Sequence, residues 1–206
     1  MRTWSVQELV TEARRLVVPG ERHILGITGA PGAGKSTLAA QVVAALGAQA
    51  ALVSMDGFHL ANSELDRLGL RNRKGSPDTF DAAGYVALLR RLRQRREDVV
   101  YAPLFDRMLD ESVGSAVPVS SDVPLVVTEG NFLLHDTAHW PDVGGLLDEC
   151  WYVEIKTETR VARLSARHET YGRSPAEALA WANGTDAENA LVVERSKPRA
   201  TLVVQL

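Results

Sequence analysis

Residues 29–37 read GAPGAGKST and match the phosphate-binding pattern G-x-x-x-x-G-K-[ST]. An apolar run precedes this loop at 24–28, and a helix-forming run follows it at 38–46. A strand, a glycine-rich loop and a helix in this order predict a nucleotide-binding α/β fold. The glycines permit a tight turn whose backbone N–H groups point inward, toward an anion at the N-terminus of the helix.

Two side chains of this loop have expected roles of their own. Lys35 is expected to reach the β- and γ-phosphates of ATP, and the Ser36 hydroxyl is expected to ligate Mg²⁺. The residues predicted to bind the nucleotide are Gly29, Ala30, Pro31, Gly32, Ala33, Gly34, Lys35, Ser36 and Thr37.

The composition is that of a globular protein with no marked charge. Of 206 residues, 45% are hydrophobic and 24% are charged, so we expect one domain over residues 1–206. The net charge of −3 gives no reason to expect a nucleic-acid or membrane partner. The single cysteine, Cys150, suits a reducing compartment and a packed core position. With neither a signal peptide nor a long apolar run in the sequence, we expect a cytoplasmic protein.

Hydrophobic periodicity predicts the order of the elements. An amphipathic helix is expected at 5–17, with Ser5 as its N-cap and Glu8 completing a capping box. Further helices are expected at 82–96, near 143–147 and at 157–169, and two more lie before the last strand. Buried strands are expected at 22–28, 50–55, 123–128, 149–155 and 200–205. This alternation predicts a three-layer α/β fold of the P-loop NTPase type, with a five-stranded, mainly parallel sheet.

Two segments depart from that alternation. Residues 57–122 form an excursion from the sheet, irregular at 60–81 and rich in turns at 110–122, where a short hairpin is expected. We expect this excursion to bind the phosphate acceptor. Residues 160–185 are expected to form a helical lid over the nucleotide.

Acidic side chains follow predicted strands or loops at Asp56, Asp81 and Glu129. Ligands in open parallel sheets bind at the carboxyl ends of the strands, so these side chains are expected to face one site. Phosphoryl transfer to a hydroxyl needs a carboxylate to accept the proton and a metal to bridge the phosphates. Asp56 is predicted to be the base and Glu129 to hold Mg²⁺, although sequence alone also allows the two roles to be exchanged.

Basic side chains recur on the predicted lid. Arg160, Arg163 and Arg167 are spaced three and four residues apart, so they lie on neighbouring turns of one helix face. Arg173 follows in the next loop. Arginines of a closing lid stabilise the charge that develops on a transferred phosphoryl group. Arg163 and Arg167 are predicted to be catalytic and Arg173 to contact the nucleotide.

A set of motifs carries a family resemblance. They are the phosphate loop, MDGFHL at 55–60, PDTFD at 77–81, PLFDR at 103–107, TEGN at 128–131 and the ending at 186–189 and 200–204. Together they resemble the phosphoribulokinase, uridine kinase and bacterial pantothenate kinase group of P-loop kinases, especially small members of the nucleoside kinase-like or fructose-transport-system-kinase type.

The resemblance implies an ATP- and Mg²⁺-dependent kinase that acts on a hydroxyl of a small molecule. It also implies Asp56 as the base and an acceptor pocket elsewhere on the excursion. The residues implied for that pocket are Asp81, Tyr101, Phe105 and Arg107. Phe58 and His59, close to Asp56, are further candidates for contact with the acceptor, and packing of His59 under the loop is the open alternative. Uridine kinases usually carry tyrosine at the position of His59, and the imidazole changes how a base or sugar stacks. Arg71, Arg73 and Lys74 fit either an anionic acceptor group or a solvated loop.

The leading hypothesis is therefore transfer of the γ-phosphate of ATP to a nucleoside or sugar-type acceptor. Two alternatives stay open: a pantothenate kinase-like activity, and a nucleotide-binding regulator that has lost its chemistry. A GTPase is disfavoured because the chain lacks the guanine-reading Asn-Lys-x-Asp motif. A homodimer is the default expectation for the oligomeric state.

Overall fold

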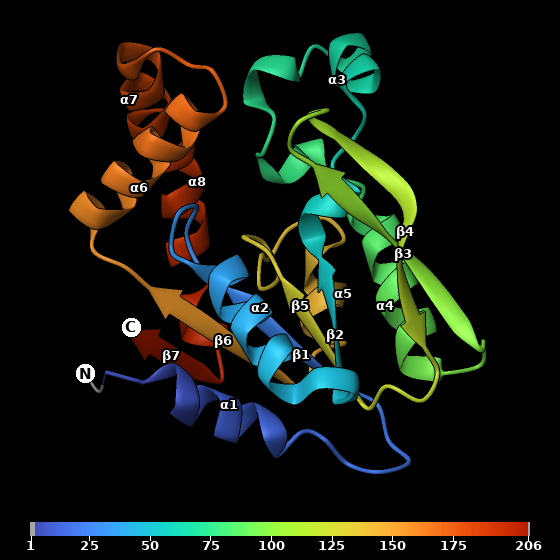
Figure 1. Cartoon of the computed structure of the whole chain (residues 1–206). Helices are drawn as coiled ribbons and strands as arrows, with labels where there is room; N and C mark the ends of the chain where they lie inside the picture. Colours follow the sequence, from blue (N-terminus) through green and yellow to red (C-terminus); the bar gives the residue numbers. More distant parts are fainter. Residues whose placement is uncertain (1–2, 206) are drawn as a thin grey trace.

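A computed structural model describes residues 3–205 of the chain (Figure 1). Its main sheet has five parallel strands in the order β2-β5-β1-β6-β7. They are β1 (His23–Thr28), β2 (Ala50–Ser54), β5 (Leu125–Glu129), β6 (Glu149–Glu154) and β7 (Leu202–Gln205). Helices cover both faces of the sheet, which is why the strands read as continuous apolar runs. The predicted five-stranded parallel sheet is confirmed.

Alternate side chains of each strand enter two separate cores. Leu25 and Ile27 pack toward α1 (Val6–Arg14) and α2 (Lys35–Leu46). Ile24 packs on the opposite face, toward α4 (Ala82–Gln94), α5 (Trp140–Gly144) and α8 (Thr185–Glu194). The period of two along a strand thus accounts for the three layers.

Helix boundaries follow local signals. The capping box between Ser5 and Glu8 is present as predicted, but α1 ends at Arg14 rather than at residue 17. The predicted helix near 143–147 lies three residues earlier, because Pro141 starts α5 in its first turn and Gly145 ends it. The helix α4 ends at Gln94, where Arg95 adopts a φ of 50°.

The excursion at 57–122, hereafter the acceptor arm, is more regular than predicted. It contains α3 (Asn62–Leu68) within the segment expected to be irregular. Its strands β3 (Val99–Asp106) and β4 (Glu111–Ser120) pair antiparallel, so the hairpin is much longer than the short one expected within 110–122. The arm begins with a close approach, since a Cβ on Gly57 would lie 2.5 Å from the Pro103 carbonyl oxygen.

The segment predicted to be a lid, called the lid below, contains α6 (Thr157–Thr170) and α7 (Pro175–Asn183) and is followed by α8. Figure 1 shows the lid and the acceptor arm as two separate projections, on opposite sides of the loop that leads into α2. Over residues 3–205, no helix is long and apolar enough to cross a membrane. The arrangement leaves the phosphate loop at the base of a space between the two projections.

Candidate active site

The phosphate loop has the backbone that its glycines permit. Gly29, Gly32 and Gly34 have φ values of 148°, 78° and 98°, which side chains other than glycine rarely adopt. A Cβ on Gly29 would lie 2.5 Å from the Val153 carbonyl oxygen, and one on Gly32 would lie 2.9 Å from Leu164 Cγ. The loop is therefore pressed between β6 and the lid helix. It leads directly into the N-terminus of α2 at Lys35, which is the geometry of an anion site.

Lys35 is buried, with 7% of its surface exposed. Its Nζ donates a hydrogen bond to the Ala30 carbonyl oxygen at 3.0 Å. Burial lowers the pKa of Lys35 to about 8, while the nearby carboxylates of Glu129 and Asp56 act to raise it. A bound phosphate would supply a stronger counter-charge to this ammonium group. Lys35 thus fits the predicted contact with nucleotide phosphates.

Ser36 and Glu129 meet at the carboxyl end of β5. Ser36 Oγ donates to Glu129 Oε2 at 3.1 Å, and Ser54 Oγ donates to Glu129 Oε1 at 2.5 Å. Burial and the neighbouring Asp56 raise the pKa of Glu129, against the effects of Lys35 and the two hydroxyls. One buried carboxylate beside one hydroxyl is an oxygen donor set that suits Mg²⁺ when water and phosphate oxygens complete the shell.

Within residues 3–205, no group of three or more His, Cys, Asp or Glu side chains could hold a metal by itself. Mg²⁺ in nucleotide sites keeps several waters and binds through one or two protein ligands plus phosphate oxygens. The pair Ser36 and Glu129 accordingly fits the predicted metal site.

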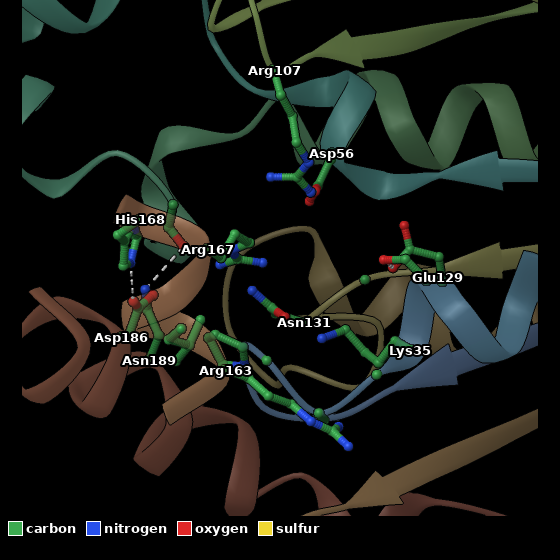
Figure 2. Close-up of a pocket in the computed structure, with 18 of the residues that line it drawn as sticks. Lys35, Asp56, Arg107, Glu129, Asn131, Arg163, Arg167, His168, Asp186 and Asn189 are labelled. Carbon is green, nitrogen blue, oxygen red and sulfur yellow. Dashed lines mark hydrogen bonds and ion pairs between the residues drawn. The ribbon is translucent and has the colours of Figure 1, made fainter. Parts of the chain in front are cut away.

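Asp56 lies just beyond β2, in the turn Met55–Phe58. Its backbone N–H donates to Ser54 Oγ at 3.2 Å, and its Oδ2 lies 3.3 Å from Arg107 Nη2. Asp56 lines a cavity of about 1330 Å³, together with Lys35 and Glu129 (Figure 2). One cavity therefore holds the predicted base, the predicted phosphate ligand and the predicted metal ligand.

His59 lies in an aromatic wall of this cavity. Its ring centroid is 4.0 Å from that of Phe80 and 4.7 Å from that of Phe105. Its Nδ1 is 2.8 Å from the Asp56 carbonyl oxygen. Burial lowers the pKa of His59, so the neutral imidazole is favoured at pH 7. His59, Phe105 and Arg107 all line the cavity, as predicted for acceptor residues.

Three other residues predicted to bind the acceptor do not line the cavity. The Phe58 ring packs against Tyr85 in the core, at 5.0 Å between centroids. Asp81 caps α4, where its Oδ1 accepts a hydrogen bond from the Gly84 N–H at 2.8 Å. Tyr101 lies on β3 with 54% of its surface exposed. Phe58 thus packs in the core and Asp81 caps a helix, whereas Tyr101 faces solvent.

The lid arginines divide into two groups. Arg163 and Arg167 line the cavity, and neither side chain has a hydrogen bond or ion pair with another residue between 3 and 205. Arg163 Nη1 lies 3.5 Å from the position that a Cβ on Gly34 would take, directly over the phosphate loop. Burial and the facing guanidinium of Arg107 lower the pKa of Arg167. Two cations that make no hydrogen bond or ion pair among residues 3–205 therefore line the cavity beside the phosphate loop.

The other two arginines are engaged with protein groups. Arg160 is buried and its Nη1 donates to the Asp186 carbonyl oxygen at 3.4 Å. Arg173 lines the cavity with its guanidinium stacked on Trp181, 3.9 Å from the ring centroid. Arg173 remains a candidate for the predicted nucleotide contact, whereas Arg160 joins α6 to α8.

The three basic residues of the loop 71–76, predicted to bind an anionic acceptor or to face solvent, have different surroundings. Arg73 pairs with Asp78 at 2.8 Å and does not line the cavity. Arg71 and Lys74 do line the cavity. Lys74 Nζ lies 2.9 Å from Asp110 Oδ2, and Arg71 Nη2 lies 3.8 Å from the same oxygen, so these two cations share one carboxylate of the acceptor arm.

Sequence reasoning gave no role to several polar residues that line the cavity. They are Asn131, His168, Asp186 and Asn189. Figure 2 shows Asn131 between Lys35 and Arg167 in that view, and it shows the other three together on the lid side. Asn131 is the last residue of the motif TEGN at 128–131, a signal that could have given it a role. The spacing of three between Asp186 and Asn189 places both on one helix face, which is a weaker signal.

Comparison with known proteins agrees with this geometry. The model of the phosphoribulokinase / uridine kinase family matches residues 24–205. A Schizosaccharomyces pombe relative named "Putative uridine kinase" is 31% identical over 98% of this chain and 90% of its own length. A pantothenate kinase of Clavibacter sepedonicus is 32% identical over 88% of this chain and 66% of its own length.

A solved structure extends the similarity to the whole fold. The "putative fructose transport system kinase" of Silicibacter sp. TM1040 superposes with a TM-score of 0.88 and 36% identity, over 97% of this chain and 98% of that one. Kinases of this P-loop type generally use ATP and Mg²⁺, in keeping with the loop and the donor set described above. The chain belongs to the phosphoribulokinase / uridine kinase family of P-loop kinases.

Proposed function

We propose that this protein transfers the γ-phosphate of ATP to a hydroxyl group of a small molecule. One observation carries the proposal: Asp56 shares a cavity with Lys35, Ser36 and Glu129, and the arginines Arg163 and Arg167 of α6 line the same cavity. A carboxylate on one side and several phosphate-binding groups on the other are the parts that in-line phosphoryl transfer requires.

The proposed roles follow from position and charge. Lys35 and the loop amides hold the phosphates, and Ser36 and Glu129 would hold Mg²⁺, which would neutralise phosphate charge. Asp56 accepts the proton of the acceptor hydroxyl while the oxygen of that hydroxyl bonds to the γ-phosphorus. The bond from that phosphorus to the bridging oxygen breaks, and ADP leaves. Arg163 and Arg167 stabilise the charge on the transferred group.

We further propose a nucleoside or a sugar-type molecule as the acceptor. The aromatic wall of His59, Phe80 and Phe105 supports this, because such rings stack on bases and on the apolar faces of sugars. The name of the uridine kinase-like relative supports the same class. A pantothenate kinase-like activity is the second candidate, favoured by the 32% identity to a protein of that name.

The proposal is tested by ADP release from Mg·ATP with a panel of nucleosides, pantothenate, glycerate, and free and phosphorylated sugars. We expect turnover that depends on one class of acceptor and that is lost in Lys35→Ala. ATP binding without ADP release for any acceptor would instead favour the nucleotide-binding regulator.

A further inference from the structure

Two polar residues on α8 lie against the cavity although neither belongs to the phosphate loop or to the proposed acceptor pocket. Asp186 and Asn189 are 7% and 5% exposed, and both line the cavity. Buried polar side chains are costly unless they are hydrogen-bonded, so their partners indicate what they do.

Asn189 reaches across to the acceptor arm. Its Nδ2 donates to the Gly75 carbonyl oxygen at 3.1 Å (Figure 2). Between residues 3 and 205, this is the one hydrogen bond that joins helices α6–α8 to the acceptor arm. Gly75 has a φ of 98°, and its loop also carries Arg71 and Lys74 to the cavity wall. Asn189 thus holds the backbone of a loop whose side chains line the cavity.

Asp186, one turn earlier on α8, bonds instead to the lid helix α6. Its carbonyl oxygen accepts from Arg160 Nη1 at 3.4 Å, and its Oδ2 lies 2.7 Å from His168 Nε2. These two contacts flank Arg163 and Arg167 on the same helix. One turn of α8 is therefore bonded to the helix with the lid arginines, and the next turn is bonded to the acceptor arm.

We propose that Asn189 is a positioning residue, which fixes the loop 71–76 of the acceptor arm relative to the lid arginines. This inference rests on the proposed kinase function. Nucleotide phosphates draw Arg163 and Arg167 inward, and the contacts of Asp186 and Asn189 transmit that movement to the loop. The loop then closes on the acceptor only when nucleotide is bound.

Amide hydrogen exchange on the full-length protein tests the coupling without any acceptor. The variant Asn189→Asp keeps the size of the side chain but places a carboxylate oxygen against the Gly75 carbonyl. Glu188→Gln is the matched control, because Glu188 is the exposed neighbour on the same helix. Each protein is measured alone and with Mg²⁺ and a non-hydrolysable ATP analogue.

In the native protein and in Glu188→Gln, we expect the analogue to slow exchange both in α6 and at 70–80. In Asn189→Asp, exchange in α6 should still slow, whereas exchange at 70–80 should not. Equal protection of 70–80 in Asn189→Asp and the native protein would overturn the inference. Protection of α6 alone in the native protein would also overturn it. If the analogue protects neither segment nor the phosphate loop, the proposed kinase function itself fails.

A second variant covers the case in which Asn189→Asp does not fold. Gly75→Ala disturbs the same bond from the other side, because the φ of 98° disfavours alanine while nothing lies within 4 Å of the new Cβ. In Gly75→Ala too, the ATP analogue should slow amide exchange in α6 but not at 70–80. Once an acceptor is known, either variant should raise its KM about tenfold, as expected for one buried hydrogen bond. The Kd for ATP should stay unchanged, and a parallel loss of ATP binding would contradict a positioning role.

Discussion

Replacing Asp56 with asparagine separates a catalytic role from a structural one. Asparagine has the same size, and the hydrogen bond from the backbone N–H of residue 56 to Ser54 Oγ does not involve the changed group. The change removes the negative charge, and with it the ability to accept the proton of the acceptor hydroxyl. The proposed mechanism thus predicts a large kinetic effect with a small effect on stability.

The structure sets the size of both effects. The only charged partner of Asp56 within hydrogen-bonding range, among residues 3–205, is Arg107 at 3.3 Å. Side-chain exposures of 26% for Asp56 and 42% for Arg107 make this a solvent-screened pair, worth at most about 1 kcal/mol. In a chain of 206 residues, that loss lowers Tm by about 2 to 4 °C. Loss of a general base lowers turnover about 100- to 10,000-fold, or about 2.7 to 5.4 kcal/mol in activation free energy.

The assay compares kcat, the Kd for ATP and Tm in the native protein, in Asp56→Asn and in the control Asp142→Asn. Asp142 forms an ion pair with Arg90 outside the cavity at 3.1 Å, with exposures of 53% and 54%. We expect the two variants to lose similar stability and to bind ATP normally, while only Asp56→Asn loses turnover. Turnover of Asp56→Asn within tenfold of the native value, with Tm and ATP binding intact, would refute the assignment of Asp56 as base.

Three further predictions use other residues of the structure. Glu129→Gln should raise the Mg²⁺ concentration for half-maximal activity about 10- to 100-fold, and an unchanged Mg²⁺ titration would exclude Glu129 from the metal site. Burial lowers the pKa of His59 below its usual 6.5, so the folded state binds fewer protons than the unfolded state and the free energy of unfolding should fall as pH drops below 6.5. His59→Phe should remove the contribution of His59 to the pH dependence of the free energy of unfolding, which is at most about 1.4 kcal/mol per pH unit. The same pH dependence in His59→Phe and the native protein would contradict this prediction. Cys150 is 3% exposed and burial raises its pKa, so a thiol reagent should label it only after unfolding, and rapid labelling of the native protein would show the packing to be wrong.

The sequence was sufficient for the parts of the site that follow strands of the sheet. Each strand is a continuous apolar run, and parallel strands present their carboxyl ends at one edge. That rule brought Asp56 and Glu129 together with the phosphate loop before any distances were known. Capping chemistry likewise predicted where α1 begins, because the box of Ser5 and Glu8 is a local signal.

Residues outside the sheet were harder to predict, because their orientation depends on contacts between distant segments. A carboxylate before a helix can cap the helix or face a ligand, and Asp81 caps α4. The exposure of Tyr101 depends on the register of β3 with β4, which shifts between Ala102 and Leu104. The contact from Asn189 to Gly75 spans 114 residues of sequence. No local pattern specifies such a pair.

The central claim is that the γ-phosphorus of ATP moves to an acceptor oxygen in the cavity that Asp56 shares with Lys35. Phosphorus NMR of Mg·ATP with the enzyme and the acceptor selected by the panel follows this atom directly. We predict that the γ-phosphorus resonance is replaced by that of a phosphate ester in equal amount to the ADP formed. Conversion of the γ-phosphorus to inorganic phosphate, at the same rate with and without the acceptor, would contradict the proposed kinase.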